Sequence, residues 1–197
     1  MITFDEASHT YRDENGRVLP SVTQVLAPLS ANAYRGVPQD VMESAATIGT
    51  AVHKMIELDV QGVLDESSLH PAVAEYLPAW RRFLVESRFE VLGSEMRVAS
   101  RRYAFAGTLD LYGLIHGKHA LIDAKRVAQV QRTTGPQTAG YEIALREETG
   151  LPADTRIDRY ALQLVGDKFH LRPLTDPADQ RVFLAALTLH NWSAKAA

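Results

Sequence analysis

The chain has 197 residues, of which 46% are hydrophobic and 23% are charged, and its formal net charge is −3. This composition is that of an ordinary globular domain, and a pI near 6.2 argues against a protein that coats nucleic acid over its whole surface. There is no cysteine, which excludes disulfides, iron–sulfur clusters and cysteine nucleophiles.

The first part of the chain is predicted to form a small β-hairpin followed by helices. Asn15-Gly16 lies between two weakly alternating segments, which is typical of a hairpin turn, and Pro20-Ser21 then leads into a short helix. Asp40 is the predicted N-cap of a longer helix over 41–60. The polar opening predicts no secretory signal, and no apolar run reaches the ~20 residues of a membrane span.

The rest of the chain changes from helical to alternating periodicity after residue 90. Before that point a helix is predicted over 71–87, and Pro78 within it should kink or break it. The later elements are predicted as strands over 91–99, 103–115 and 120–127, a helix over 137–148, strands over 156–165 and 169–174, and a helix over 177–191.

This order of elements predicts an α+β fold with a mixed, α/β-like sheet. No linker rich in proline, glycine or serine separates two halves, so we expect one domain over 1–197. Within it, 1–40 should form the N-terminal hairpin and extension, 41–175 the core, and 176–197 a C-terminal helix.

Asp123 and Lys125 carry the strongest chemical signal of the sequence. On a strand, residues two apart point to the same face, while Ile122 and Ala124 point into packing. The carboxylate can bind a hard cation, and the ammonium can orient a water or stabilise charge that develops on a phosphate. The alternative is an ion pair on a solvated strand.

Asp110 lies on the preceding predicted strand, 13 residues before Asp123. A strand, a tight turn and a return strand fill this interval, so the two carboxylates can lie side by side, ~5 Å apart at Cβ. Such a pair repels unless it is protonated or bridged by a cation, and Mg²⁺ or Mn²⁺ suits oxygen ligands. The Ala124 carbonyl could add a ligand, and Gly107 would let the backbone approach one closely. Alternatively, Asp110 faces water.

Three weaker signals accompany these residues. His53 lies on a predicted helix and could complete a metal shell, although a lone helical histidine is more often structural. Gln137 and Tyr141 share a helical face, where they could contact phosphate or stack on a base. Glu95 is either a further carboxylate of the site or the partner of Arg97 in a surface pair.

A basic segment surrounds the two aspartates. Between Arg97 and Arg132 the only acidic residues are Asp110 and Asp123. This pattern fits a polyanionic substrate, whereas the alternative is an ordinary sheet edge protected by cations. The bases of the segment are Arg97, Arg101, Arg102, Lys118, Lys125, Arg126 and Arg132.

The ordered set of motifs resembles the PD-(D/E)xK nuclease superfamily, most closely its RecB-like branch with many phage exonucleases. The motifs that carry the resemblance are Gly49 to His53, Gly107 to Asp110, Ile122 to Lys125, and Gln137 to Tyr141, within about 45–165. The segment from Phe4 through His9 and Tyr11 to Thr23 is similar to the start of phage-type members. The resemblance implies a restriction-endonuclease-like core, with a central mixed β-sheet flanked by helices.

The resemblance also implies residue roles. His53, Asp110 and Asp123 would be metal ligands together with the Ala124 carbonyl, Glu95 a further acid, and Lys125 the catalytic lysine. The residues expected to contact DNA or support the site are Gln137, Tyr141, Arg126, Thr108, Ser21 and Thr23. Two positions depart from the family pattern, because Leu109 replaces its proline and Asp123 stands where many members carry glutamate.

The implied activity is hydrolysis of DNA phosphodiesters with one or two Mg²⁺ or Mn²⁺ ions, most often as an exonuclease of phage recombination or repair. We then expect a cytoplasmic protein of a bacterium or a phage-infected cell, with DNA as substrate. A separate recombination or helicase protein could be its partner, since the chain holds no G-x-x-x-x-G-K-[ST] motif. The alternatives are a sequence-independent endonuclease, a non-catalytic nucleic-acid-binding module on a decayed nuclease fold, a hydrolase of another phosphoester, and a scaffold protein with coincidental motifs.

Overall fold

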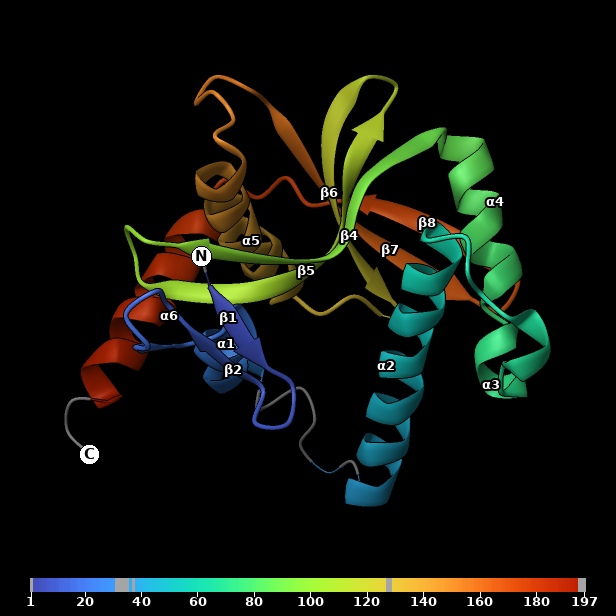
Figure 1. Cartoon of the computed structure of the whole chain (residues 1–197), viewed down its shortest axis with the longest axis horizontal. Helices are drawn as coiled ribbons and strands as arrows, with labels where there is room; N and C mark the ends of the chain where they lie inside the picture. The colour runs from blue at the N-terminus through green and yellow to red at the C-terminus, as the bar shows by residue number, and fades with distance from the viewer. Residues whose placement is uncertain (1, 31–35, 37, 127–128, 195–197) are drawn as a thin grey trace.

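The computed structural model describes residues 2–30, 36, 38–126 and 129–194. It has a mixed α+β architecture with a five-stranded sheet, a three-stranded N-terminal sheet and flanking helices, as the sequence predicts (Figure 1). Among the described residues, no helix is long and apolar enough to cross a membrane.

Short N-terminal strands are followed along the chain by a group of helices and then by the strands of the main sheet. In chain order the elements are β1 (Thr3–Asp5), β2 (Thr10–Arg12), β3 (Val18–Leu19), α1 (Val22–Ser30), α2 (Gln39–Val60), a 3₁₀ turn η2 (Glu66–Ser68), α3 (Pro71–Ala74), α4 (Leu77–Ser87), β4 (Phe89–Ser100), β5 (Phe105–Ile115), β6 (Lys118–Lys125), α5 (Thr134–Thr149), β7 (Ile157–Val165), β8 (Lys168–Pro173) and α6 (Asp179–Ala194).

The central sheet has the strand order β4-β5-β6-β7-β8. β4, β5 and β6 form antiparallel neighbours, α5 connects β6 to the parallel strand β7, and β8 returns antiparallel at the edge. The β5–β6 turn is tighter than the sequence suggests, because His116 and Gly117 alone form it. Both have positive φ, 50° and 76°, which suits a two-residue hairpin.

Helices cover both faces of this sheet (Figure 1). α1, α5 and α6 pack on one face in a core that includes Val98, Leu121 and Phe183. α2, α3 and α4 pack on the other face, around Trp80 and Ile122. The sheet is therefore buried on both sides, which explains why β6 reads as a nearly continuous apolar run.

The N-terminal sheet confirms the predicted hairpin and adds a strand, β1, that was not predicted separately from the sequence. Its turn uses Asp13, whose carboxylate accepts hydrogen bonds from the N–H groups of Asn15 and Arg17. The following helix α1 begins with a capping box, because Ser21 Oγ accepts the Gln24 N–H while Gln24 Oε1 accepts the Ser21 N–H.

Several predicted boundaries are wrong by a few residues. α2 begins at Gln39 with Pro38 at its N-cap, so Asp40 lies inside the first turn and is not the cap. α5 begins at Thr134, one turn earlier than predicted. The break at Pro78 is confirmed: α3 ends before it, and Pro78 lies in the first turn of α4, where a missing N–H is harmless. Residue 127, the predicted end of the third strand, lies outside the described residues.

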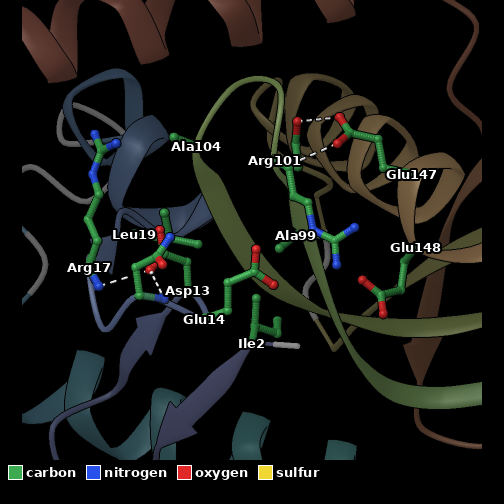
Figure 2. A pocket seen from close by; sticks show the side chains of 12 residues that line it. Ile2, Asp13, Glu14, Arg17, Leu19, Ala99, Arg101, Ala104, Glu147 and Glu148 are labelled. Carbon is green, nitrogen blue, oxygen red and sulfur yellow. Dashed lines mark hydrogen bonds between the residues drawn. The ribbon is translucent and has the colours of Figure 1, made fainter.

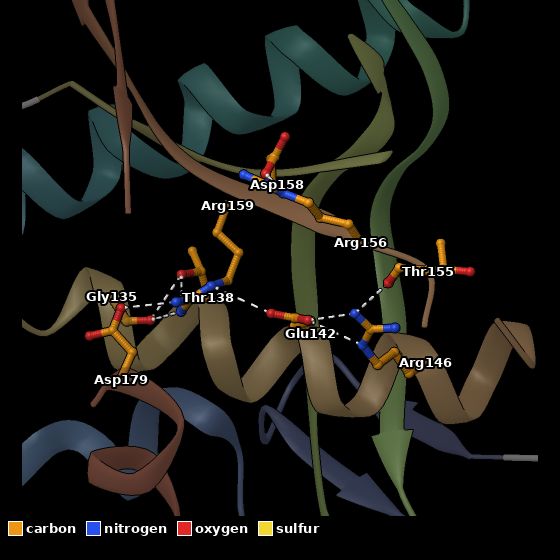
Figure 3. Close-up of polar contacts among 9 residues, drawn as sticks. All are labelled: Gly135, Thr138, Glu142, Arg146, Thr155, Arg156, Asp158, Arg159 and Asp179. Atoms are coloured by element: carbon orange, nitrogen blue, oxygen red, sulfur yellow. Dashed lines mark hydrogen bonds and ion pairs between the residues drawn. The ribbon is translucent and has the colours of Figure 1, made fainter. Parts of the chain in front are cut away.

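A buried ion-pair network around Arg159 joins β7 to α5 and α6 (Figure 3). Its guanidinium donates to the Gly135 carbonyl over 2.9 Å and lies 3.1 Å from Asp179 and 3.4 Å from Glu142. A Cβ at Gly135 would lie 2.5 Å from the Asp179 carboxylate, so glycine is needed for this close approach. The network therefore fixes the start of α5 over the sheet.

We expect Arg159→Met to lower the free energy of unfolding by about 2–4 kcal/mol, because it leaves the buried carboxylate of Asp179 without its partner, whereas Glu142 keeps its ion pair with Arg146. Arg156→Met is the matched control. Arg156 belongs to the same strand region, but its side chain is 83% exposed, so its ion pair with Asp158 contributes little. Urea denaturation of both variants measures the difference, and equal stabilities would contradict a structural role for the network.

Candidate metal and catalytic site

Asp110 and Asp123 occupy opposing positions on β5 and β6, one step beyond the pair Leu111–Ile122. Asp110 Oδ2 accepts the Ala124 N–H over 2.7 Å. The carboxylate of Asp110 thus takes the place of a backbone carbonyl as the acceptor for the Ala124 N–H. The predicted juxtaposition of the two aspartates is confirmed, and burial raises the pKa of Asp110.

Asp123 is the most buried acid of the site, with only 1% of its surface exposed. Lys125 Nζ lies 2.8 Å from Asp123 Oδ2, which confirms that both side chains share one face of β6. The other oxygen, Oδ1, has no hydrogen-bond partner among the described residues. Burial raises the pKa of Asp123 to about 6, although the nearby Lys125 charge opposes this shift. The carboxylate is consequently an under-satisfied acceptor.

His53 and Glu95 reach the same point from two other elements. His53 Nδ1, from the middle of α2, lies 3.3 Å from Glu95 Oε1 and 3.5 Å from Asp110 Oδ1. One ligand atom of each of these three residues lies within 4.8 Å of the others. The negative charge of Asp110 and the contact with Glu95 raise the pKa of His53 to about 9, against the opposing effect of burial.

Glu95 is turned toward the site by an irregularity of β4. Its φ of 48° is unusual for a residue other than glycine, and it lies between the regular pairs Ser94–Leu111 and Met96–Leu109. From the sequence, this acid ranks below the two aspartates. Nothing in the local sequence around Glu95 distinguishes a left-handed residue from a regular strand position, so its approach to His53 could be found only in the folded chain.

The donor set fits a hard divalent cation. Three carboxylates and one imidazole converge, and oxygen-rich sites of this kind suit Mg²⁺ or Mn²⁺ better than softer metals. A cation would also offset the repulsion between Asp110 and Asp123 and satisfy the orphaned oxygen of Asp123. The predicted participation of the Ala124 carbonyl stays a prediction, because the known contact of Ala124 uses its N–H.

Tyr141 and Gln137 lie next to the acids, as predicted. The Tyr141 hydroxyl is hydrogen-bonded by Gln137, and burial together with the charges of Asp110 and Asp123 raises its pKa well above the usual value. Gly107 has a different role from the one expected. A Cβ there would lie 2.7 Å from Cε1 of Tyr141, so the glycine makes room for this ring rather than for a ligand.

The other predicted DNA contacts already have partners within the fold. Thr108 Oγ1 hydrogen-bonds the hydroxyl of buried Tyr11 at 2.8 Å, which ties the N-terminal sheet to β5. Buried Ser21 caps α1 and lies 3.1 Å from the hydroxyl of exposed Thr23. Arg126 donates to the Ala45 carbonyl and so ties the end of β6 to α2. These contacts favour support of the site, and contact with DNA stays a prediction.

The basic segment seen in the sequence does not form a single patch. Arg101 and Lys118 lie in turns or strand starts at opposite ends of β5. Arg101 lines a cavity of about 230 Å³ that is acidic rather than basic, and none of the predicted site residues lines it (Figure 2). The acids of this cavity are Asp13, Glu14, Glu147 and Glu148. Arg101 and Lys118 are therefore separated by the fold, whereas Lys125 of the same segment lies beside Asp123.

Two residues that hold the site in place were not predicted from the sequence. Tyr11 supports the strand of Asp110 through Thr108, and Arg159 anchors the helix of Tyr141. Both contacts join segments far apart in the chain, and neither leaves a local pattern. The sequence points to Tyr11 only through the similarity of segment 4–23 to phage-type members, and nothing in it indicates the contact with Thr108.

No protein-family model matches this chain, and no curated protein is significantly similar to it. The likeness to the PD-(D/E)xK superfamily therefore rests on the motifs alone. What the fold adds is their convergence, since α2, β4, β5 and β6 bring acids, an imidazole and an ammonium to one place.

Asp123→Asn should stabilise the metal-free protein at pH 8 and remove its stabilisation by Mn²⁺. The folded-state pKa of about 6 exceeds the ordinary value of 3.8, so the protonated form is favoured in the folded chain. The ionised carboxylate therefore destabilises the fold above pH 6, by about 1–3 kcal/mol, and has no such effect below pH 4. Denaturation in EDTA at both pH values measures this gain, and a variant that is less stable at pH 8 would contradict it.

His53→Ala should weaken Mn²⁺ binding at least about tenfold, the usual scale for a residue near a metal. Calorimetric titration of Mn²⁺ into the metal-free protein measures the change. His190→Ala on α6 is the control, because His190 lies far along the chain and outside the cluster. An unchanged titration for His53→Ala would remove the imidazole from the site.

Proposed function

We propose that this protein is a Mg²⁺- or Mn²⁺-dependent DNA nuclease with a PD-(D/E)xK active centre. The observation that supports this most is the convergence of Asp110, Asp123 and Lys125, with His53 and Glu95 beside them. Two carboxylates on adjacent strands, with a lysine two residues after the second, form the donor set that phosphodiester hydrolysis needs.

Asp110 and Asp123 would hold the ion, with His53 and Glu95 as neighbouring ligands. A divalent cation bound there supplies a positive charge that polarises the phosphate and increases the acidity of water. Lys125 is 27% exposed while Asp123 holds its Nζ, so its ammonium can reach substrate and remain fixed in direction. It would orient the attacking water and stabilise negative charge on the phosphate oxygens.

Tyr141 and Gln137 close one side of this centre. The Tyr141 ring packs against Gly107 on β5, and its hydroxyl is already bonded to Gln137. Water is thereby excluded behind Asp110 and Asp123, which strengthens their interaction with a cation. Of these two residues, Gln137 is partly exposed, so its amide could contact a phosphate or a base edge.

The topology is consistent with the restriction-endonuclease-like core that the motifs imply. Three antiparallel strands carry the acids, and a helix then crosses to a parallel strand. Within this proposal we favour an exonuclease of phage recombination or repair in the cytoplasm, acting on DNA ends, over an endonuclease. A separate helicase or recombination protein would then supply the substrate.

Lys125→Ala should lower the rate of DNA hydrolysis by about 100- to 1,000-fold, the usual loss when one charge-stabilising donor is removed. The assay compares linear and covalently closed plasmid DNA in Mg²⁺, Mn²⁺ or EDTA. Lys118→Ala is the matched control, because Lys118 begins the same strand at the end away from the acids. Lys118→Ala should keep the wild-type melting temperature. Lys125→Ala removes the partner of buried Asp123, so it is assayed well below its own melting temperature.

Loss of linear DNA alone, only with metal and only when Lys125 is present, is the result expected of an exonuclease. Cleavage of closed circles as well would favour an endonuclease at the same centre. Full activity of Lys125→Ala would overturn the assigned role of the lysine. Binding of DNA without cleavage in any metal would favour the decayed nuclease fold instead.

A further inference from the structure

The edge strand β8 presents a row of basic side chains on one face. Lys168, His170 and Arg172 alternate along the strand and are exposed, while Phe169 and Leu171 pack on the opposite side against α4 and its neighbours. Among the described residues, no ion pair or side-chain hydrogen bond involves any of these three side chains. The row is therefore available to a ligand.

This row lies on the same face of the sheet as the catalytic candidates. In the strand register, Arg172 of β8 lies opposite Ala161 of β7, and Ala161 lies opposite Asp123 of β6. In the same way, His170 lies opposite Gln163, and Gln163 lies opposite Lys125. Partners across a ladder share a face. Since neighbouring strands lie ~4.8 Å apart, the row runs about 10 Å from Lys125 at the level of the backbone.

A groove continues from this row toward the start of α5. It has a volume of about 630 Å³, and Arg132 and Arg172 are its basic lining residues. Its two acids have partners inside the protein, since Asp176 accepts the Ala178 N–H and Asp179 pairs with Arg159. Asp179 is therefore neutralised by Arg159, whereas Asp176 keeps its charge, and Arg132 and Arg172 have no ion-pair partner among the described residues.

We propose that the β8 row and this groove bind the phosphate backbone of the DNA strand that is being cut, on one side of the metal site. The proposal rests on the proposed nuclease function and adds the path of the substrate. With 3.4 Å of axis per nucleotide, a separation of about 10 Å places the row about three nucleotides from the cleaved bond. The competing explanation is that cations on an edge strand only prevent aggregation.

The test compares two double variants that each remove two positive charges. Lys168→Gln/Arg172→Gln alters the row, and Arg101→Gln/Lys118→Gln alters the basic segment that the sequence alone suggested. Binding of a fluorescent 20-base-pair duplex is measured by anisotropy in EDTA at several salt concentrations, and KM and kcat for linear DNA are measured in Mg²⁺. The charge-retaining variant Lys168→Arg/Arg172→Lys tests whether charge alone matters.

We expect the row variant to raise Kd and KM three- to tenfold, to lower the salt dependence of log K by about 1–2, and to leave kcat nearly unchanged. The control pair and the charge-retaining variant should behave like wild type. If wild type cleaves DNA but the row and control variants are indistinguishable, the β8 path is wrong and the nuclease stands. If wild type binds DNA through the row but never cleaves it, the proposed activity fails and the β8 surface remains. If wild type neither binds nor cleaves, both are wrong.

Discussion

The rest of the site depends on one constraint: two carboxylates, Asp110 and Asp123, are forced together on adjacent strands of a sheet that is buried on both faces. Left alone, such a pair is strongly unfavourable, since both burial and mutual repulsion oppose ionisation. Three interactions within the fold partly compensate the negative charge of the two carboxylates. Lys125 pairs with one acid, His53 with the other, and a backbone N–H of β6 donates to Asp110.

These three interactions do not fully compensate the buried charge of the two carboxylates, and the remaining deficit indicates a functional role. One oxygen of Asp123 has no hydrogen-bond partner among the described residues, and the pKa of Asp123 stays raised. A core built only for stability would hold an apolar or amide side chain at this position. Groups whose ionisation is shifted by burial and neighbouring charge are typical of functional sites, and a hard cation would satisfy this one.

The supports of the site come from every layer of the fold. α2 carries His53 across one face, α5 carries Tyr141 across the other, and the N-terminal sheet reaches β5 through Tyr11. Arg159 then fixes the start of α5 by its buried contacts with α6 (Figure 3). The site therefore stands on rigid elements rather than on loops, which suits chemistry that requires fixed geometry.

Much of this could be predicted from the sequence. The period-two pattern around Asp123 and Lys125 determines that they share a face, and the short interval from Asp110 determines that β5 and β6 are neighbours. The break at Pro78 likewise follows from a local steric rule. Such features depend only on backbone geometry and on residues close together in the chain.

What only the tertiary structure decided are the contacts between distant segments. Glu95 approaches His53 because Glu95 itself adopts a left-handed backbone conformation within β4. No local sequence pattern predicts this conformation. Gly107 makes room for the ring of Tyr141. The residues of the basic segment lie at both ends of β5, while the basic side chains of β8 lie on the same face of the sheet as Asp123 and Lys125. Charge and close packing act through space, so the sequence supplies these groups and the fold alone determines which of them meet.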